Sequence, residues 1–134
     1  MSDYTPPAIT DDLGAKPEVP EPTGTAPDEL VTDDVVVGDG AAAKPGDQVT
    51  VHYVGVSFSD GKQFDASWDR GAPFDFPLGA GRVIQGWDFG VTGMRVGGRR
   101  TLVIPPELGY GARAMGPIGA GETLIFVVDL IGVG

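Results

Sequence analysis

Residues 83–94 of this 134-residue chain read VIQGWDFGVTGM and contain one of its two tryptophans. Ile84, Trp87 and Val91 recur at i, i+3 and i+7, a spacing that places them on one face of a helix. Glycines interrupt the stretch, and each one weakens a helix by about 1 kcal/mol relative to Ala. The sequence therefore predicts one short helix that depends on its surroundings. Elsewhere only residues 105–111, PPELGYG, suit a helix, and there for a single turn.

On both sides of this stretch, the sequence pattern is typical of short strands separated by turns. Residues 48–58 alternate, with Val49, Val51 and Tyr53 on one face. Asp60-Gly61 is a strong hairpin signal. Residues 122–133 form the longest apolar run and are predicted to be a central strand. Further strands are predicted within residues 30–37, 72–79 and 99–105, the second of them short or at an edge because prolines flank it.

These elements predict an α+β fold. Five or six mostly antiparallel strands each need one face covered, and the short helix is the candidate cover. We therefore expect a curled antiparallel sheet of five to six strands wrapped around one short helix. This arrangement belongs to residues 29–134, which we expect to form a single domain.

The first 28 residues differ in composition from the rest. They hold six of the twelve prolines and few large apolar side chains, so they cannot offset the entropy of ordering a chain. Residues 1–34 carry nine of the nineteen acidic residues but only one basic residue, Lys16. The sequence predicts that residues 1–28 are an acidic, Pro-rich tail, disordered or loosely draped. Residues 35–134, with ten acidic and eight basic residues, are nearly neutral.

Composition excludes several classes of chemistry. The chain has no Cys, which excludes disulfides, thiolate catalysis and Cys-based zinc sites. Its single histidine, His52, excludes a two-histidine metal site, and a Ser-His-Asp triad would have to use it. We expect His52 to be a half-exposed strand residue. The chain has neither the phosphate-binding loop Gly-x-x-x-x-Gly-Lys-Ser/Thr nor the dinucleotide motif Gly-x-Gly-x-x-Gly. No metal or cofactor is predicted.

Charge and hydropathy limit the kinds of partner that the protein can have. No signal peptide is evident, and no apolar run approaches the roughly 20 residues of a membrane span. We expect a cytoplasmic protein with no membrane partner. The nearly neutral body argues against nucleic-acid binding, and the basic cluster Arg95, Arg99 and Arg100 is interpreted as a solvated strand end.

Aromatic residues near predicted turns remain unexplained by these exclusions. They indicate a pocket for a small ligand or a peptide. From the residues alone, Trp87 and Phe126 could equally be core residues. Asp65 could be an exposed turn acid, with Arg70 as its structural partner.

Six motifs of the chain resemble those of a known family. The motifs VHYVG (51–55), DGKQFDAS (60–67), GAPFDFPLG (71–79), VIQGW (83–87), VGGRRTLVIPPELGYG (96–111) and TLIFVVDL (123–130) occur in order. Together they resemble the FKBP-type peptidyl-prolyl cis-trans isomerases, and in particular their short, single-domain bacterial members. The likeness spans residues 29–134. Met115 and Pro117 stand near positions that are often His and Ile in the family.

The resemblance implies a pocket between the sheet and the helix. Trp87 would form its floor under the proline ring, a tyrosine hydroxyl and the Ile84 N–H would bind substrate carbonyls, and Asp65 would lie at the wall near the twisting amide. Phe76 is expected to stay a core residue. The implied catalytic residues are Tyr53, Asp65, Trp87, Tyr110 and Phe126, and the implied substrate- or macrolide-binding residues are Phe64, Arg70, Phe74, Val83, Ile84 and Ile118.

The implied activity is rotation about Xaa-Pro bonds in peptides and folding proteins, with tacrolimus and rapamycin as expected ligands. Rotation faces a barrier of about 18–20 kcal/mol from amide resonance. Because twisting reduces the charge separation of the amide, a dry aromatic pocket favours the twisted form without a nucleophile or a metal. The alternative is a non-catalytic module that binds proline peptides or macrolides. A monomer is expected in either case.

Overall fold

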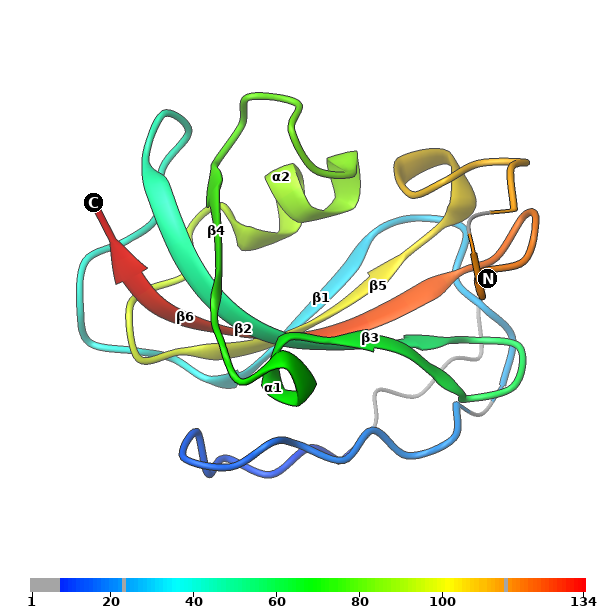
Figure 1. The fold of residues 1–134 in the computed structure, drawn as a ribbon, viewed down its shortest axis with the longest axis horizontal. Helices are drawn as coiled ribbons and strands as arrows, with labels where there is room; N and C mark the ends of the chain where they lie inside the picture. The colour runs from blue at the N-terminus through cyan, green and yellow to red at the C-terminus, as the bar shows by residue number, and fades with distance from the viewer. Residues whose placement is uncertain (1–7, 23, 115) are drawn as a thin grey trace.

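The computed structural model describes residues 8–22, 24–114 and 116–134, and it confirms the α+β fold (Figure 1). Six strands form one antiparallel sheet, and α2 lies across one of its faces. The strands are β1 (Val31–Val36), β2 (Gln48–Ser57), β3 (Gln63–Ala66), β4 (Phe74–Pro77), β5 (Arg99–Ile104) and β6 (Leu124–Val133). The helices are α1 (Ser67–Arg70) and α2 (Gln85–Val91), with a 3₁₀ turn, η1, at Pro106–Leu108.

The sheet has the order β1-β5-β6-β2-β3, and β4 also pairs with β2. The strand predicted to be central, β6, lies between β5 and β2. Strands β4 and β3 occupy successive lengths of the same edge of β2, with Val49 opposite Phe76 and Val54 opposite Ala66. The one-turn helix α1 separates β3 from β4. The sequence did not predict α1, because four residues are too few to show a helical period.

The alternation predicted along β2 sorts its side chains onto two faces. Val49, Val51 and Tyr53 are buried on the face that α2 covers. Val54 and Val56 belong to a second apolar cluster. The sheet therefore has apolar residues on both faces, and the face opposite α2 also needs a cover.

The glycines of α2 allow the helix to lie close to the sheet. A Cβ atom on Gly86 would come within 2.5 Å of Ile104 Cγ2, and one on Gly90 within 2.8 Å of Leu102 Cδ2. Both neighbours are fully buried residues of β5. The weak helix-forming tendency of the stretch is thus the consequence of a contact between backbone and sheet that side chains would prevent.

A substitution at Gly86 tests this contact. Helix propensity alone predicts that Gly86→Ala stabilises the protein by about 1 kcal/mol, whereas overpacking costs about 1–3 kcal/mol. We expect a net loss in the free energy of unfolding, measured in urea, and a smaller loss when Gly86→Ala is made in an Ile104→Ala background, which removes all three side-chain atoms that the added Cβ would meet. Gly119→Ala is the control, because nothing lies within 4 Å of its added Cβ. A stabilised Gly86→Ala variant would contradict the close packing.

The N-terminal segment lies across the face opposite α2 (Figure 1). Residues 8–22 contain no helix or strand, yet Pro17 is buried and Val19 packs against the second apolar cluster. Lys16 Nζ also lies 2.8 Å from a carboxylate oxygen of Asp69 in α1. The first seven residues of the predicted disordered tail, and residue 23, lie outside the described residues, and the division at residues 28 and 29 stays a prediction.

Arg99 shows how this segment is held. Its side chain is fully buried, and Nε and Nη2 donate to the two carboxylate oxygens of Asp129 at 2.6 and 2.8 Å. Nη1 donates to the carbonyl oxygen of Thr10 at 2.7 Å, and Nη2 to that of Ala15 at 3.2 Å. The interpretation of a solvated strand end is wrong for Arg99, because Asp129 lies opposite it in the strand register and the N-terminal segment closes over both.

Candidate active site

A cavity of about 440 Å³ opens between α2, the face of the sheet that α2 covers, and the loop after Tyr110. Its wall is mostly aromatic and aliphatic. Its lining residues are Tyr53, Phe64, Asp65, Phe74, Arg82, Val83, Ile84, Trp87, Tyr110, Pro117, Ile118 and Phe126. Ten of the eleven residues predicted from the sequence are therefore gathered in one place. Their roles stay predictions.

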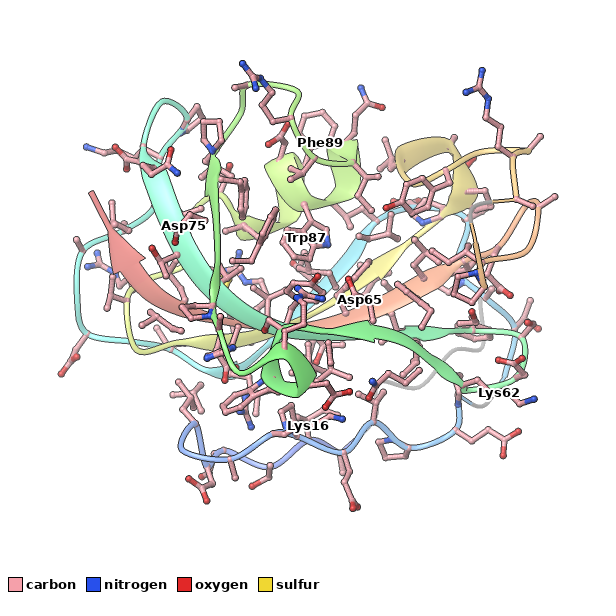
Figure 2. The ribbon with its side chains drawn as sticks, in the orientation of Figure 1. Lys16, Lys62, Asp65, Asp75, Trp87 and Phe89 are labelled. Carbon is pink, nitrogen blue, oxygen red and sulfur yellow. The ribbon has the colours of Figure 1, made fainter. Side chains whose placement is uncertain are left out.

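Trp87 lies at the base of this cavity, with 4% of its surface exposed. Figure 2 shows its side chain directed from α2 toward the sheet, while Phe89 of the same helix points away. The Trp87 ring meets those of Tyr53 and Phe126 edge-to-face, with centroids 4.9 and 5.2 Å apart. Such contacts fix ring orientations. Phe76 packs behind Trp87 at 5.5 Å and is buried outside the cavity, as expected of a core residue.

Gly55 of β2 lets two wall residues converge. A Cβ atom there would lie 2.7 Å from both the Phe64 and the Phe126 rings. The two rings stand edge-to-face with centroids 5.4 Å apart. Sequence reasoning did not single out this glycine, although a Gly inside a strand is a known signal of close approach.

Tyr53, Asp65 and Arg70 form one hydrogen-bonded network at the cavity wall. The Tyr53 hydroxyl donates to Asp65, and Arg70 Nη1 donates to the other carboxylate oxygen at 2.5 Å. Arg70 Nη2 donates to the Tyr53 hydroxyl oxygen at 2.8 Å, and the guanidinium lies 5.5 Å from the Tyr53 ring centroid. Arg70 does not line the cavity. It holds two residues that do.

Burial raises the pKa of Tyr53 above its ordinary value of 10, and the hydrogen bond to Asp65 raises it further. The folded protein therefore keeps this proton at a pH where the unfolded chain releases it. That contribution to stability is complete below about pH 10 and is lost as the pH rises through the folded-state pKa. In urea unfolding at several alkaline pH values, we expect Tyr53→Phe to lose stability less steeply than the wild type. An identical slope would contradict the shift.

Two hydrogen-bond donors of the cavity wall are free to bind a ligand. Ile84 is the N-cap of α2, and its carbonyl accepts from Trp87 N–H at 2.9 Å. Within the described residues neither the Ile84 N–H nor the Tyr110 hydroxyl makes a hydrogen bond. The loop that carries Tyr110 is closed by a bond from Gly121 N–H to the carbonyl of Gly111, at 2.9 Å.

Arg82 and Pro117 line the cavity without having been predicted. Arg82 directly precedes the VIQGW motif, and this position is the signal that could have placed it at the cavity. Pro117 had been noted only as a departure from the family pattern, and the adjacent Ile118 is buried in the wall as predicted. Met115 lies outside the described residues.

His52 has a structural setting on the outer face of the sheet. Its Nδ1 lies 2.8 Å from Ser67 Oγ, and its ring stacks on Trp68 with centroids 4.4 Å apart. Across residues 8–22, 24–114 and 116–134, no group of three or more His, Asp or Glu side chains is placed to hold a metal ion. The same residues contain no helix with the length and hydropathy of a membrane span.

Comparisons with known proteins point to one family. A family model described as FKBP-type peptidyl-prolyl cis-trans isomerase matches residues 40–131. The FK506-binding protein of Streptomyces anulatus is 58% identical over 120 residues, which cover 88% of this chain and 97% of that protein. A probable FK506-binding protein of Corynebacterium glutamicum is 53% identical over 116 residues, covering 87% and 97% of the two chains.

Solved structures agree as well. The crystal structure of AtFKBP13 matches with a TM-score of 0.72 at 43% identity, covering 78% of this chain and 93% of that one. FkpA from Escherichia coli gives a TM-score of 0.71, also at 43% identity, over 78% and 47% of the two chains. With the aromatic cavity between α2 and the sheet, these matches establish that the chain belongs to the FKBP-type peptidyl-prolyl cis-trans isomerases.

Proposed function

We propose that the aromatic cavity is where this isomerase rotates Xaa-Pro bonds, with the proline ring resting on Trp87. The observation that carries the proposal is the combination of a buried aromatic floor with two free donors at its rim. The rings of Trp87, Tyr53 and Phe126 fix one another edge-to-face, so the floor is formed before the substrate arrives. Phe64, Phe74, Val83 and Ile118 complete the apolar wall.

The proposed mechanism is binding that favours the twisted amide. A planar amide has a large charge separation and is well solvated by water, whereas the twisted amide has lost resonance and is less polar. An apolar wall therefore favours the twisted form over the planar one. The Tyr110 hydroxyl and the Ile84 N–H hold the flanking carbonyls, so that the peptide rotates about one bond only. No covalent bond forms or breaks.

Asp65 is proposed to act at the wall, beside the twisting amide. Its carboxylate receives bonds from Tyr53 and Arg70, which fix its position and that of the Tyr53 ring. Arg70 acts through these two residues and does not touch the substrate. This assigns Arg70 a positioning role.

Folding proteins and proline-containing peptides are the proposed substrates, and tacrolimus and rapamycin the proposed inhibitors. The relatives named FK506-binding proteins support the second point. The cytoplasmic location and monomeric state expected from the sequence stay proposals. In the described residues, three large apolar side chains are exposed: Val37, Phe89 and Ile131.

An exchange-NMR assay on the peptide Ala-Leu-Pro-Phe, with and without tacrolimus, tests the proposal. We expect catalysed cis-trans exchange that one equivalent of tacrolimus suppresses. Tyr110→Phe should lower kcat/KM by up to about tenfold, the value of one hydrogen bond of about 0.5–1.5 kcal/mol. A protein that binds tacrolimus but leaves the exchange rate at its uncatalysed value would instead be the non-catalytic binding module.

A further inference from the structure

We propose that Arg82 determines substrate specificity, by favouring proline segments with an acidic side chain next to the Xaa-Pro unit. This inference rests on the proposed function of the cavity. Among the described residues, two charged ones line the cavity, Asp65 and Arg82. The Asp65 carboxylate is already paired with Arg70. Arg82 is exposed, and its side chain has no partner among the described residues.

The loop that carries Arg82 is fixed at its backbone. The buried carboxylate of Asp88 accepts hydrogen bonds from Gly79 N–H at 2.8 Å and from Gly81 N–H at 3.2 Å. Both glycines have positive φ, 79° and 71°, a conformation that other residues rarely adopt. Leu78, at the start of the loop, is buried and donates its N–H to the Asp47 carbonyl at 2.8 Å. The guanidinium therefore extends from a held backbone position at the rim.

No acid of the described residues forms an ion pair with Arg82. The carboxylate of Asp88 is used by the loop backbone. Asp75 lies between Phe74 and Phe76 in β4, and because side chains alternate along a strand, it faces away from the cavity that Phe74 lines. Within the described residues, the Arg82 guanidinium at the rim therefore has no ion-pair partner.

Arg82 is within reach of a bound substrate. It precedes Ile84 by two residues, which span at most about 7 Å of extended chain, and an arginine side chain covers a similar length. A substrate carbonyl at the Ile84 N–H places the adjoining substrate side chains beside this guanidinium. Exposed ion pairs contribute about 0.2–1 kcal/mol, which corresponds to a preference of up to about fivefold in kcat/KM. Salt should reduce it.

Exchange NMR on two peptide series tests the inference. In one series the residue before Leu-Pro-Phe is Glu, Gln or Lys. In the other the residue after Ala-Leu-Pro is Glu, Gln or Lys. In the wild type at low salt, we expect the Glu peptide of at least one series to exceed its Gln counterpart about two- to fivefold in kcat/KM, and the Lys peptide to fall below it. The Glu-to-Gln ratio should approach one in Arg82→Gln and invert in Arg82→Glu.

Lys62→Glu is the matched control, since it changes the net charge equally. Lys62 lies in the hairpin loop between β2 and β3, at the end of the sheet away from α2 (Figure 2), so its ratio should equal that of the wild type. A wild-type ratio of one in both series, or a ratio that Arg82→Glu leaves unchanged, overturns the inference. A shift of equal size in Lys62→Glu does so too, because it would mark a net-charge effect. Failure of the proposed function is distinct: every peptide of both series would then exchange at its uncatalysed rate.

Discussion

Trp87→Ala is expected to lower kcat/KM for Leu-Pro peptides about 100-fold in protein that remains folded, the loss that corresponds to about 2–3 kcal/mol of apolar contact. Trp87 forms the base of the cavity and fixes the rings of Tyr53 and Phe126, so its removal takes away the floor and loosens the wall. The change should also lower the free energy of unfolding by about 3–5 kcal/mol, as for other large buried aromatics. Urea unfolding and exchange NMR, under conditions where the variant is folded, measure the two effects.

Phe76→Ala separates the loss of activity from the loss of stability. Phe76 is as deeply buried as Trp87 and packs against it, but it lies outside the cavity lining. We expect a similar loss of stability, about 3–5 kcal/mol, and a much smaller loss of kcat/KM. If the two variants lose activity in proportion to their stability, Trp87 has no role beyond packing.

Asp129→Asn is expected to lower the free energy of unfolding by about 3–5 kcal/mol, the usual consequence of leaving a buried charge without its partner. Arg99 is fully buried in the wild type, and the carboxylate of Asp129 receives two of its bonds. The neutral amide leaves the guanidinium uncompensated. Urea unfolding measures the loss.

Asp34→Asn is the matched control for this substitution. Asp34 pairs with Arg100, the next residue of β5, at 2.6 Å, but its side chain is 42% exposed. An exposed pair contributes about 0–1 kcal/mol. Replacing the buried pair by Arg99→Met with Asp129→Leu should recover part of the lost stability. Equal losses for Asp129→Asn and Asp34→Asn would contradict a buried ion pair.

Most of the fold could be predicted from local patterns. The alternation of Val49, Val51 and Tyr53 placed these residues on the face of the sheet that α2 covers. The apolar run at 122–133 indicated the central strand. The lining of the cavity followed from the resemblance, because motifs such as FDAS and VIQGW carry the wall residues in a fixed order.

What the sequence did not reveal depends on partners that are distant along the chain or on very short elements. Arg99 looked like a solvated strand end because Asp129 lies 30 residues away and the Thr10 carbonyl 89 residues away. The helix α1 has four residues and no period. Arg82 is a single exposed residue, so only its position at the cavity distinguishes it.

The proposed contact between the substrate proline and Trp87 can be tested directly by NMR. Nuclear Overhauser effects can be measured between the proline ring of bound Ala-Leu-Pro-Phe and the aromatic protons of the protein. We expect cross-peaks to the rings of Trp87 and Phe126, and none to Trp68, which packs with the cluster on the outer face of the sheet. Contacts to Trp68, or exchange catalysis with no contact to Trp87, would contradict the proposed binding of the proline ring on Trp87.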